Sequence, residues 1–364
     1  MKVGIVGLPN VGKSTIFNAL TASNIPANNY PFCTIEPNMG IVNIPDQRLQ
    51  TINSYIHTEK IIPTSIEFVD IAGLVKGASA GEGLGNQFLS HIRNVDAIVH
   101  IVRGFENTDI THVEGSIDPI RDNQIIETEL LLKDLETLNK RKDKIAKIAK
   151  SGDKDSIKEL KLLDIVINEL DKGNFLFSYE GNESEISIIN SWSLLSNKPM
   201  FYLCNVDEQD IENNDNPYFL KLQEYANQKN VISIKLCGSI EMEISKFQNE
   251  DDKNDFLNIY GLKEPGLHTL INLAYKNLNL ITYFTAGPQE IRAWTIPNHT
   301  YAPQAAGKIH SDFERGFIKA EIYHIDDLIK FKSEVSLKEN GKIRQEGKDY
   351  RVHDGDVIFF KFNV

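Results

Sequence analysis

The run GLPNVGKS, from Gly7 to Ser14, constrains the fold more than any other feature of this chain. It follows the apolar, β-branched segment KVGIV, which suits a buried parallel strand, and a helical pattern begins at Thr15. A glycine-rich loop between a strand and a helix is the setting in which this motif holds phosphate. Backbone N–H groups at the start of the helix face the anion there, and the helix dipole favours its charge. The sequence therefore predicts an α/β fold with a phosphate-binding loop.

The residues of this loop have separate expected roles at a nucleotide. Lys13 would reach the β and γ phosphates, and the Ser14 hydroxyl would bind Mg²⁺. Lys13 is also a predicted catalytic residue, because phosphoryl transfer depends on charge neutralisation. The predicted phosphate contacts are Asn10, Val11, Gly12, Lys13, Ser14 and Thr15.

The composition narrows the class of protein. A chain of 364 residues is long enough for two or three domains, and 41% hydrophobic and 25% charged residues are typical of a soluble globular protein. No stretch reaches the roughly 18 apolar residues of a membrane span. Because a cleaved signal peptide would remove the phosphate-binding loop, we expect a cytoplasmic location without membrane contact. The net charge of −12 argues against general coating of nucleic acid, and no DNA partner is expected.

The three cysteines, Cys33, Cys204 and Cys237, provide neither a disulfide framework nor the CxxC spacing of a metal site. Cys204 and Cys237 each end an apolar run and are expected to be buried thiols. Cys33 lies in a polar loop, where a reactive or redox-sensitive role is an open alternative.

Short apolar runs alternate with helical patterns along much of the chain. This alternation predicts a doubly wound, mostly parallel sheet with helices on both faces. The predicted P-loop nucleotide-binding domain spans residues 1–279. Its strands are expected at Val3–Val6, Ile66–Val69, Ala97–Val102, Met200–Leu203 and Val231–Leu236.

A long helical insertion interrupts this domain at residues 123–195. Apolar residues recur at helical spacing in IIETELLLKDLETL and IKELKLLDIVINEL, and the intervening Ser151-Gly152-Asp153 is typical of a turn. We expect an antiparallel, coiled-coil-like arm. A solvated helix face and a contact with a phosphate-rich partner both explain the basic character of its first helix. The basic residues are Lys140, Arg141, Lys142, Lys144, Lys147 and Lys150.

The chain changes character after about Asn279. Short β-rich runs are separated by proline and glycine turns, and an Asp354-Gly355 turn precedes an alternating strand. Residues 280–364 are therefore predicted to form a β-grasp-like module. Its sequence has no evident cluster of acids, bases or metal ligands, which favours a binding domain.

Two further segments stand where a nucleotide switch would place them. Thr34, in NYPFCTIEPN, follows the phosphate-binding loop by about 20 residues, and its hydroxyl would complete the Mg²⁺ shell. In DIAGL, Asp70 ends a strand and would hold a magnesium-bound water, while the Gly73 N–H would meet the γ-phosphate. Both segments would order around a triphosphate and relax after hydrolysis.

The segment expected at the base argues for adenine. Guanine-specific proteins carry Asn-Lys-x-Asp there, whose aspartate accepts two hydrogen bonds from guanine, whereas this chain has Asn205-Val206-Asp207-Glu208. The lysine that covers the base is absent, and the carboxylate of Glu208 is one methylene longer. A guanine clamp would leave unpaired polar groups against adenine, so relaxing it should admit adenine. Backbone groups near Val206 and in CGSIE, from Cys237 to Glu241, would read its edge.

These motifs together resemble one family from end to end. GLPNVGKST, NYPFCTIEPN, DIAGLVKGASAGEGLGNQFL, NVDE and the C-terminal module are similar to the YchF subfamily of Obg-related P-loop proteins, the Obg-like ATPases. The resemblance implies a nucleotide domain, an inserted arm, a C-terminal TGS domain and ATP preferred over GTP. It also implies association with the ribosome, through its large subunit or as a whole, by way of the arm and the TGS domain. The implied base contacts are Asn205, Val206 and Glu208, with Gly238 and Ser239 in CGSIE, which lacks the alanine that many relatives carry after the serine.

The expected turnover is slow, because Leu74 stands where Ras-like enzymes place the glutamine that orients the attacking water. His112 lies in a polar loop after the strand Ala97–Val102, and an imidazole there would orient or deprotonate water near neutral pH. The family has a histidine at the matching position. A surface histidine without this role is the alternative. Asn10 offers a second route, since an asparagine there helps related proteins hold a potassium ion that compensates charge.

Together these patterns predict a slow, Mg²⁺-dependent ATPase that acts as a nucleotide switch on the ribosome. The alternatives are a GTPase of the same fold, a P-loop kinase, and a ribosome-binding adaptor whose ATP is structural. A kinase of this type would add an arginine-bearing lid over the phosphates, and none is evident near the phosphate motifs.

Overall fold

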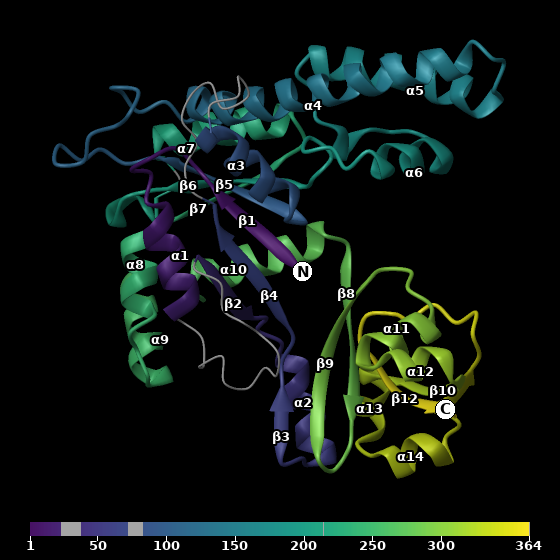
Figure 1. Cartoon of the computed structure of the whole chain (residues 1–364). Coiled ribbons are helices and arrows are strands. Elements are labelled where there is room, and N and C mark those ends of the chain that lie inside the picture. The colour runs from purple at the N-terminus through teal and green to yellow at the C-terminus, as the bar shows by residue number, and fades with distance from the viewer. Residues whose placement is uncertain (23–37, 72–82, 214, 364) are drawn as a thin grey trace. The chain divides into compact units, whose positions relative to one another are not determined.

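The computed structural model describes residues 1–22, 38–71, 83–213 and 215–363 (Figure 1). The chain divides into two compact units. The first combines Met1–Ile41 with Glu67–Leu270, and the second combines Val42–Ile66 with Ile271–Val364. Two six-stranded sheets organise the fold.

In the first sheet, the strand that precedes the phosphate-binding loop lies in the interior and has neighbours on both sides. Its order is β2 (Met39–Asn43), β4 (Ser65–Asp70), β1 (Lys2–Val6), β5 (Ala97–Arg103), β6 (Met200–Asn205) and β7 (Ile232–Leu236). The pairings from β4 through to β7 are all parallel. Every residue of β5 and β6 is buried, as strands with both faces covered require. The predicted doubly wound, mostly parallel sheet is confirmed, and β2 is a strand that the sequence pattern did not indicate.

Helices separate the strands of this sheet. They are α1 (Lys13–Ala22), α3 (Gly83–Arg93), α7 (Pro217–Gln228), α8 (Gly238–Ile244) and α9 (Glu250–Ile259), followed by α10 (Gly266–Asn277). Helix α1 packs beside α8, while α7 packs against β6 and β7. Asn216 caps α7, and Pro217 occupies its first turn, where a missing N–H costs nothing. Within the described ranges, no helix combines the length and the apolar character needed to cross a membrane.

The inserted arm is built from α4 (Pro119–Ala149) and α5 (Lys154–Asp171), which pack against each other (Figure 1). Asp118 caps α4, so the helix begins before residue 123, where the predicted arm starts. The predicted turn between the helices is present, with Gly152 at a φ of 87°. The hairpin itself is therefore as expected.

The insertion returns to the sheet through a short 3-10 helix, η3 (Leu176–Ser178), and α6 (Glu183–Ser191). Asp134 holds the end of the insertion against α4. Its buried carboxylate accepts hydrogen bonds from the N–H groups of Leu195 and Ser196. The desolvated carboxylate is thus satisfied by backbone donors at the end of the insertion.

The second sheet is mixed. Its order is β11 (Arg344–Glu346), β10 (Phe317–His324), β12 (Asp356–Phe362), β8 (Leu280–Ala286), β9 (Glu290–Pro297) and β3 (Lys60–Ile62). Strands β8 and β9 form an antiparallel hairpin, whereas β12 pairs with β8 in parallel. The predicted turn at Asp354 and Gly355 precedes β12, and Gly355 has a φ of 88°. The helices after β9 are α11 (Ala302–Ile309), α12 (Ser311–Arg315), α13 (Ile325–Phe331) and α14 (Glu334–Glu339).

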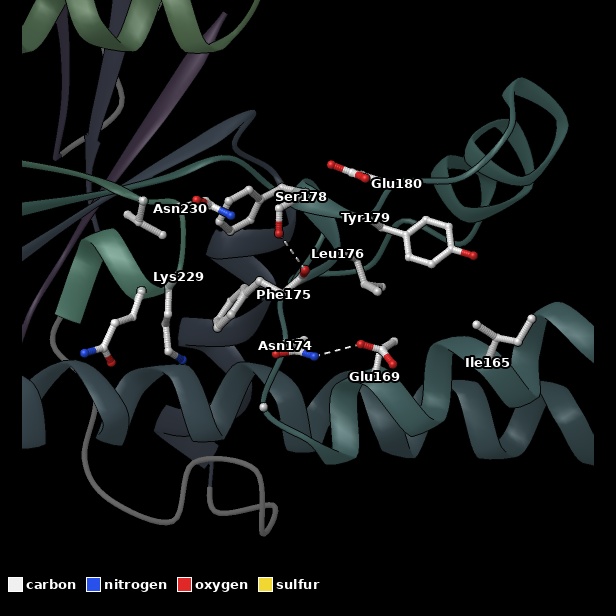
Figure 2. Close-up of a pocket in the computed structure, with 14 residues that line it drawn as sticks. Ile165, Glu169, Asn174, Phe175, Leu176, Ser178, Tyr179, Glu180, Lys229 and Asn230 are labelled. Atoms are coloured by element: carbon white, nitrogen blue, oxygen red, sulfur yellow. Dashed lines mark hydrogen bonds between the residues drawn. The ribbon is translucent and has the colours of Figure 1, made fainter. Parts of the chain in front are cut away.

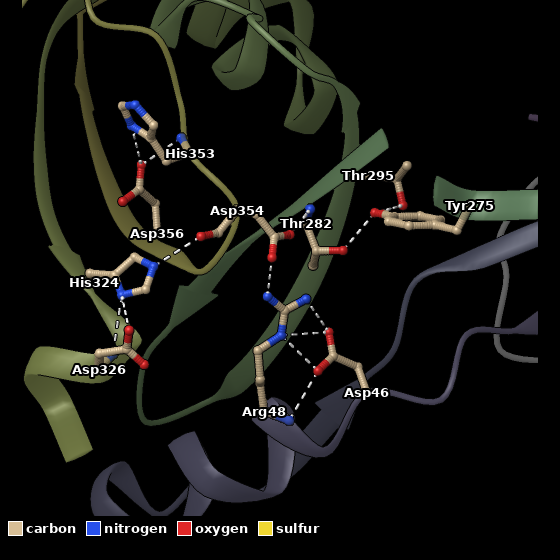
Figure 3. A network of polar contacts seen from close by, with 10 residues as sticks. All are labelled: Asp46, Arg48, Tyr275, Thr282, Thr295, His324, Asp326, His353, Asp354 and Asp356. Carbon is tan, nitrogen blue, oxygen red and sulfur yellow. Dashed lines mark hydrogen bonds and ion pairs between the residues drawn. The ribbon is translucent and has the colours of Figure 1, made fainter. Parts of the chain in front are cut away.

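An early segment of the chain belongs to this second unit. Helix α2 (Gln47–Ile56) buries Leu49 and Ile52 in one apolar cluster with residues of the C-terminal sheet. Arg48 forms ion pairs with both Asp46 and Asp354 (Figure 3). The predicted domain limits, 1–279 and 280–364, stay a prediction, but residues 42–66 pack with the C-terminal residues.

Candidate functional site

A pocket of about 760 Å³ opens at the carboxyl edge of the first sheet. Four neighbouring strands end there, each followed by a loop that lines the pocket: β1, β5, β6 and β7. Ligands of open α/β sheets bind beyond the carboxyl ends of the strands. The predicted contacts that line this pocket are Asn10, Gly12, Lys13, Ser14, Thr15, Asn205, Val206, Gly238 and Ser239.

The loop between β1 and α1 has the backbone that an anion cradle needs. Asn10 and Gly12 have φ angles of 66° and 90°. A Cβ atom on Gly12 would collide with the side-chain amide of Asn205, so glycine is required on steric and conformational grounds. The Ile16 N–H donates to the Gly12 carbonyl at 3.1 Å and starts α1. The loop therefore stands at a helix N-terminus, where negative charge is stabilised.

Lys13 forms an ion pair with Asp70 at the end of β4. The predicted phosphate lysine and the predicted metal-water carboxylate are thus neighbours. Ser14 is exposed beside them, at the start of α1. Hydroxyl and carboxylate oxygens are ligands that Mg²⁺ prefers, so Ser14 and Asp70 fit a magnesium site next to the phosphates. Four residues of the sequence analysis lie outside the described residues: Thr34, Gly73, Leu74 and Cys33.

Asn205 links the phosphate-binding loop to the loop after β7. Its side-chain nitrogen donates to the Val11 carbonyl at 3.0 Å, and its side-chain oxygen accepts from the Gly238 N–H at 2.9 Å. The predicted base contact of Asn205 stays a prediction. In this structure its side chain holds two walls of the pocket together, a role that sequence reasoning missed.

The predicted base-reading residues meet at one rim of the pocket. Glu208 accepts a hydrogen bond from the Ser239 hydroxyl at 3.0 Å, although Glu208 itself is not among the lining residues. Val206 is buried, and its N–H donates to the Leu236 carbonyl at 2.9 Å. The Cys237 thiol also lines the pocket, and burial raises its pKa. Cys204 and Cys237 are both buried free thiols, as predicted.

Phe105 and Arg103 are site residues that sequence reasoning missed. Phe105 lines the pocket directly after β5. The buried guanidinium of Arg103 lies 4.5 Å from the centre of the Phe105 ring and donates hydrogen bonds to backbone carbonyls of the loop that follows. An arginine that ends a largely apolar strand is an available signal, because a buried charge needs dedicated partners. Arg103 therefore gives this wall of the pocket a defined shape.

His112 is buried and does not line the pocket. Its Nε2 lies 2.9 Å from Oδ2 of Asp122, and its Nδ1 accepts from the Glu114 N–H at 3.2 Å. Burial raises the pKa of Asp122, while the hydrogen bonds from Arg121 and His112 act against that shift. The predicted catalytic role of His112 stays a prediction, and the structure shows its ring engaged with the start of α4.

The candidate potassium residue contacts the same loop. The Asn10 side-chain nitrogen donates to the Thr111 carbonyl at 3.1 Å, which leaves the Asn10 oxygen available to a cation. The two predicted routes to a complete catalytic site, Asn10 and His112, are therefore connected through adjacent residues.

A second pocket, of about 380 Å³, lies at the base of the arm (Figure 2). It is lined by the end of α5, the loop that contains Phe175, and residues after α7 such as Asn230. Asn174 donates to Glu169 there at 2.7 Å. None of the predicted phosphate or base contacts lies in it, so the first pocket is the candidate nucleotide site.

The strand–loop–helix cradle at the carboxyl edge of a parallel sheet defines the class: a P-loop nucleoside triphosphatase. A family model described as 50S ribosome-binding GTPase matches residues 2–140, and the YchF-GTPase C-terminal model, described as a protein of unknown function, matches residues 280–363. The chain belongs to the YchF family, as the full-length relatives below establish.

Two relatives carry the name Ribosome-binding ATPase YchF. The one from Haemophilus ducreyi is 51% identical over 363 residues, which cover 100% of this chain and 99% of the relative. The one from Bacillus subtilis is 49% identical over 365 residues and is covered completely, as is this chain. A solved structure, the Schizosaccharomyces pombe YchF GTPase, superimposes with a TM-score of 0.90 at 38% identity, covering 99% of this chain and 97% of that one. The resemblance seen in the sequence motifs is confirmed.

Proposed function

We propose that this protein is a slow, Mg²⁺-dependent ATPase that acts as a nucleotide switch on the ribosome in the cytoplasm, with GTP as the poorer substrate. The observation that carries the proposal is the pocket itself. An intact phosphate-binding loop faces a base-reading segment, Asn205 to Glu208, without the lysine and the aspartate of a guanine clamp. The names of the full-length relatives support both the hydrolysis and the ribosome binding.

The phosphate-binding loop supplies most of what phosphoryl transfer needs. Backbone N–H groups from Asn10 to Thr15 would hold the phosphates, and Lys13 would leave Asp70 to neutralise the β and γ oxygens. Mg²⁺ held by Ser14, with Asp70 beside it, would supply further positive charge to those oxygens. Positioning and charge neutralisation are sufficient for this reaction class once water is oriented.

The walls around the base favour adenine. Phe105 offers an aromatic ring in the pocket, and Arg103 fixes the loop that carries it. Stacking on an aromatic ring tolerates any base, so discrimination falls to the edge of the base. The Glu208 carboxylate is already engaged by Ser239, which weakens it further as a clamp for guanine. Backbone groups near Val206 and Gly238 would then read the adenine edge.

The arm offers a basic surface to a phosphate-rich partner. Three basic residues of α4 are paired with carboxylates of the arm: Lys140 with Glu136, Arg141 with Glu159 and Lys142 with Asp164. These ion pairs partly neutralise their positive charge. At the end of α4, Lys144, Lys147 and the C-cap residue Lys150 are exposed and make no ion pair with any residue that the structure describes. We therefore assign ribosome contact to these three lysines, at the far end of α4, with the C-terminal unit as a second contact.

Nucleotide titration and hydrolysis assays test the site. ATP should bind at least about tenfold more tightly than GTP, which corresponds to roughly 1.4 kcal/mol. Lys13→Ala should abolish hydrolysis, while Lys221→Ala, an exposed lysine on α7, should leave it unchanged. Equal or tighter GTP binding would favour the GTPase alternative. Undiminished turnover in Lys13→Ala would contradict the site itself.

A further inference from the structure

Neither ring nitrogen of His112 is free in this structure. Glu114 donates its N–H to Nδ1, and a nitrogen that accepts in this way carries no proton. The proton of the neutral ring is therefore on Nε2, which donates to Asp122 at 2.9 Å. Because both nitrogens are occupied, His112 cannot accept a proton from water while this arrangement persists.

Asp122 is held firmly where it contacts His112. It lies in the first turn of α4, the long helix of the arm, and its side chain is buried. Its second oxygen accepts from the Arg121 guanidinium at 2.9 Å, and Arg121 also donates to the Ser116 carbonyl at 2.6 Å. The loop that carries His112 is thus bonded to the first turn of α4, which we call the root of the arm.

The residues that precede His112 in the same loop are hydrogen-bonded to residues at the nucleotide pocket. Arg103 donates to the carbonyls of Phe105, Asn107 and Ile110, and Asn10 donates to the Thr111 carbonyl. His112 therefore stands between a segment bonded to the phosphate-binding loop and a helix that continues into the arm. A displacement of the root of α4 would separate Asp122 from His112 while the pocket side of the loop stays in place.

We propose that Asp122 is a positioning residue that withholds His112 from the attacking water, and that a partner which displaces the root of α4 releases it. This inference rests on the proposed function, in which the ribosome binds the arm, and on the predicted role of His112 in orienting water. The ribosome contact and His112 are connected through one helix, because α4 carries Asp122 at its start and the exposed lysines near its end. Slow turnover would then be a property of the free protein.

ATP turnover of Asp122→Ala, measured with and without ribosomes, tests the contact. Loss of the carboxylate should raise turnover without ribosomes by roughly ten- to a hundredfold, the effect of one hydrogen bond to a charged group. The stimulation by ribosomes should shrink by a similar factor. Adding His112→Ala to Asp122→Ala should remove the gain, because the released group is then absent.

Asp153→Ala is the matched control. It removes the N-cap carboxylate of α5, the other helix of the arm, without touching His112 or the start of α4, so turnover without ribosomes should stay at the wild-type value. Thermal unfolding shows whether each variant is folded. Should Asp122→Ala fail to fold, Asp122→Asn keeps the shape, loses the charge that holds Arg121, and should produce a smaller gain of the same sign.

The outcomes separate this inference from the function on which it rests. Unchanged turnover in both Asp122 variants, or an equal gain in Asp153→Ala, would overturn the inference. A lower kcat at constant KM would also overturn it, because Asp122 would then orient an active His112. Wild-type turnover that ribosomes do not raise would also overturn it. If the wild-type protein did not hydrolyse ATP or did not bind ribosomes, the proposed function would fail instead.

Discussion

Gly12 is required both by the backbone conformation of the phosphate-binding loop and by the close packing of Asn205 against it. It combines a φ of 90° with close approach to Asn205, whose side chain joins two loops of the pocket. Gly12→Ala should weaken ATP binding by about ten- to a hundredfold, since overpacking of this kind costs about 1–3 kcal/mol. Gly152→Ala is the control in an equilibrium titration, because Gly152 has a φ of 87° but open space around it. Similar affinity in both variants would contradict the steric argument.

At the residue scale, the sequence predicted what a contiguous motif contains. Gly12, Lys13 and Ser14 line the pocket because the motif specifies its own loop. The use of Asn205 was not predictable, since its partners, the Val11 carbonyl and the Gly238 N–H, meet only in the folded sheet. The engagement of His112 by Asp122 was hidden for the same reason.

Strand β5 buries a histidine in the middle of the first sheet. Burial lowers the pKa of His100 from its ordinary 6.5 to about 4, because the charged ring would lose its hydration. The unfolded chain takes up this proton near pH 6.5, whereas the folded protein stays neutral there until about pH 4. The unfolded state binds more protons in this window, so the free energy of unfolding decreases as the pH is lowered, by at most about 1.4 kcal/mol per pH unit.

Denaturant unfolding at pH 7, 6 and 5 measures this effect. His100→Leu should flatten the decline between pH 6.5 and 4, because the variant has no group to protonate at this position. Trp192 fluorescence in a Trp294→Phe background reports on the first unit, which contains Trp192 and His100. The same slope with and without His100 would show that other groups control acid stability.

At the element scale, long periodic segments were predictable and short ones were not. The arm was found because α4 and α5 carry many turns of one apolar pattern, with a glycine turn between them. Helix α4 begins at Pro119, before residue 123 of the predicted arm, because Asp118 and Pro119 begin the helix by local capping before the periodicity is evident. Strand β3 has three residues, and α2 buries only Leu49 and Ile52, so neither stood out.

The proposed ribosome contact belongs to the scale of the whole molecule, because it would couple the nucleotide pocket to the arm. Replacing Lys144, Lys147 and Lys150 with alanine should weaken ribosome binding and make it less dependent on salt, since each lost cation removes a phosphate contact. Co-sedimentation with ribosomes under ATP and under ADP, at two salt concentrations, is the measurement. ATP turnover without ribosomes should not change.

The control for this variant carries the same change of charge elsewhere. Lys221, Lys246 and Lys263 are exposed and lie outside the arm, so their replacement with alanine should leave ribosome binding near the wild-type value. Equal loss in both triple variants would show that net charge, and not the arm, controls binding. Ribosome binding that is equally strong with ATP and with ADP would favour the alternative of an adaptor whose ATP is structural.

The sequence by itself determined the class of this protein, because a phosphate-binding loop, parallel strands and a helical arm are each specified by neighbouring residues. The tertiary structure alone decided which groups are free to act. Asp122 reaches His112, Asn205 bridges two loops, and residues 42–66 join the C-terminal unit. These arrangements satisfy buried polar groups and cover apolar surface with partners distant in the chain, and such partners are identified only once the backbone has folded.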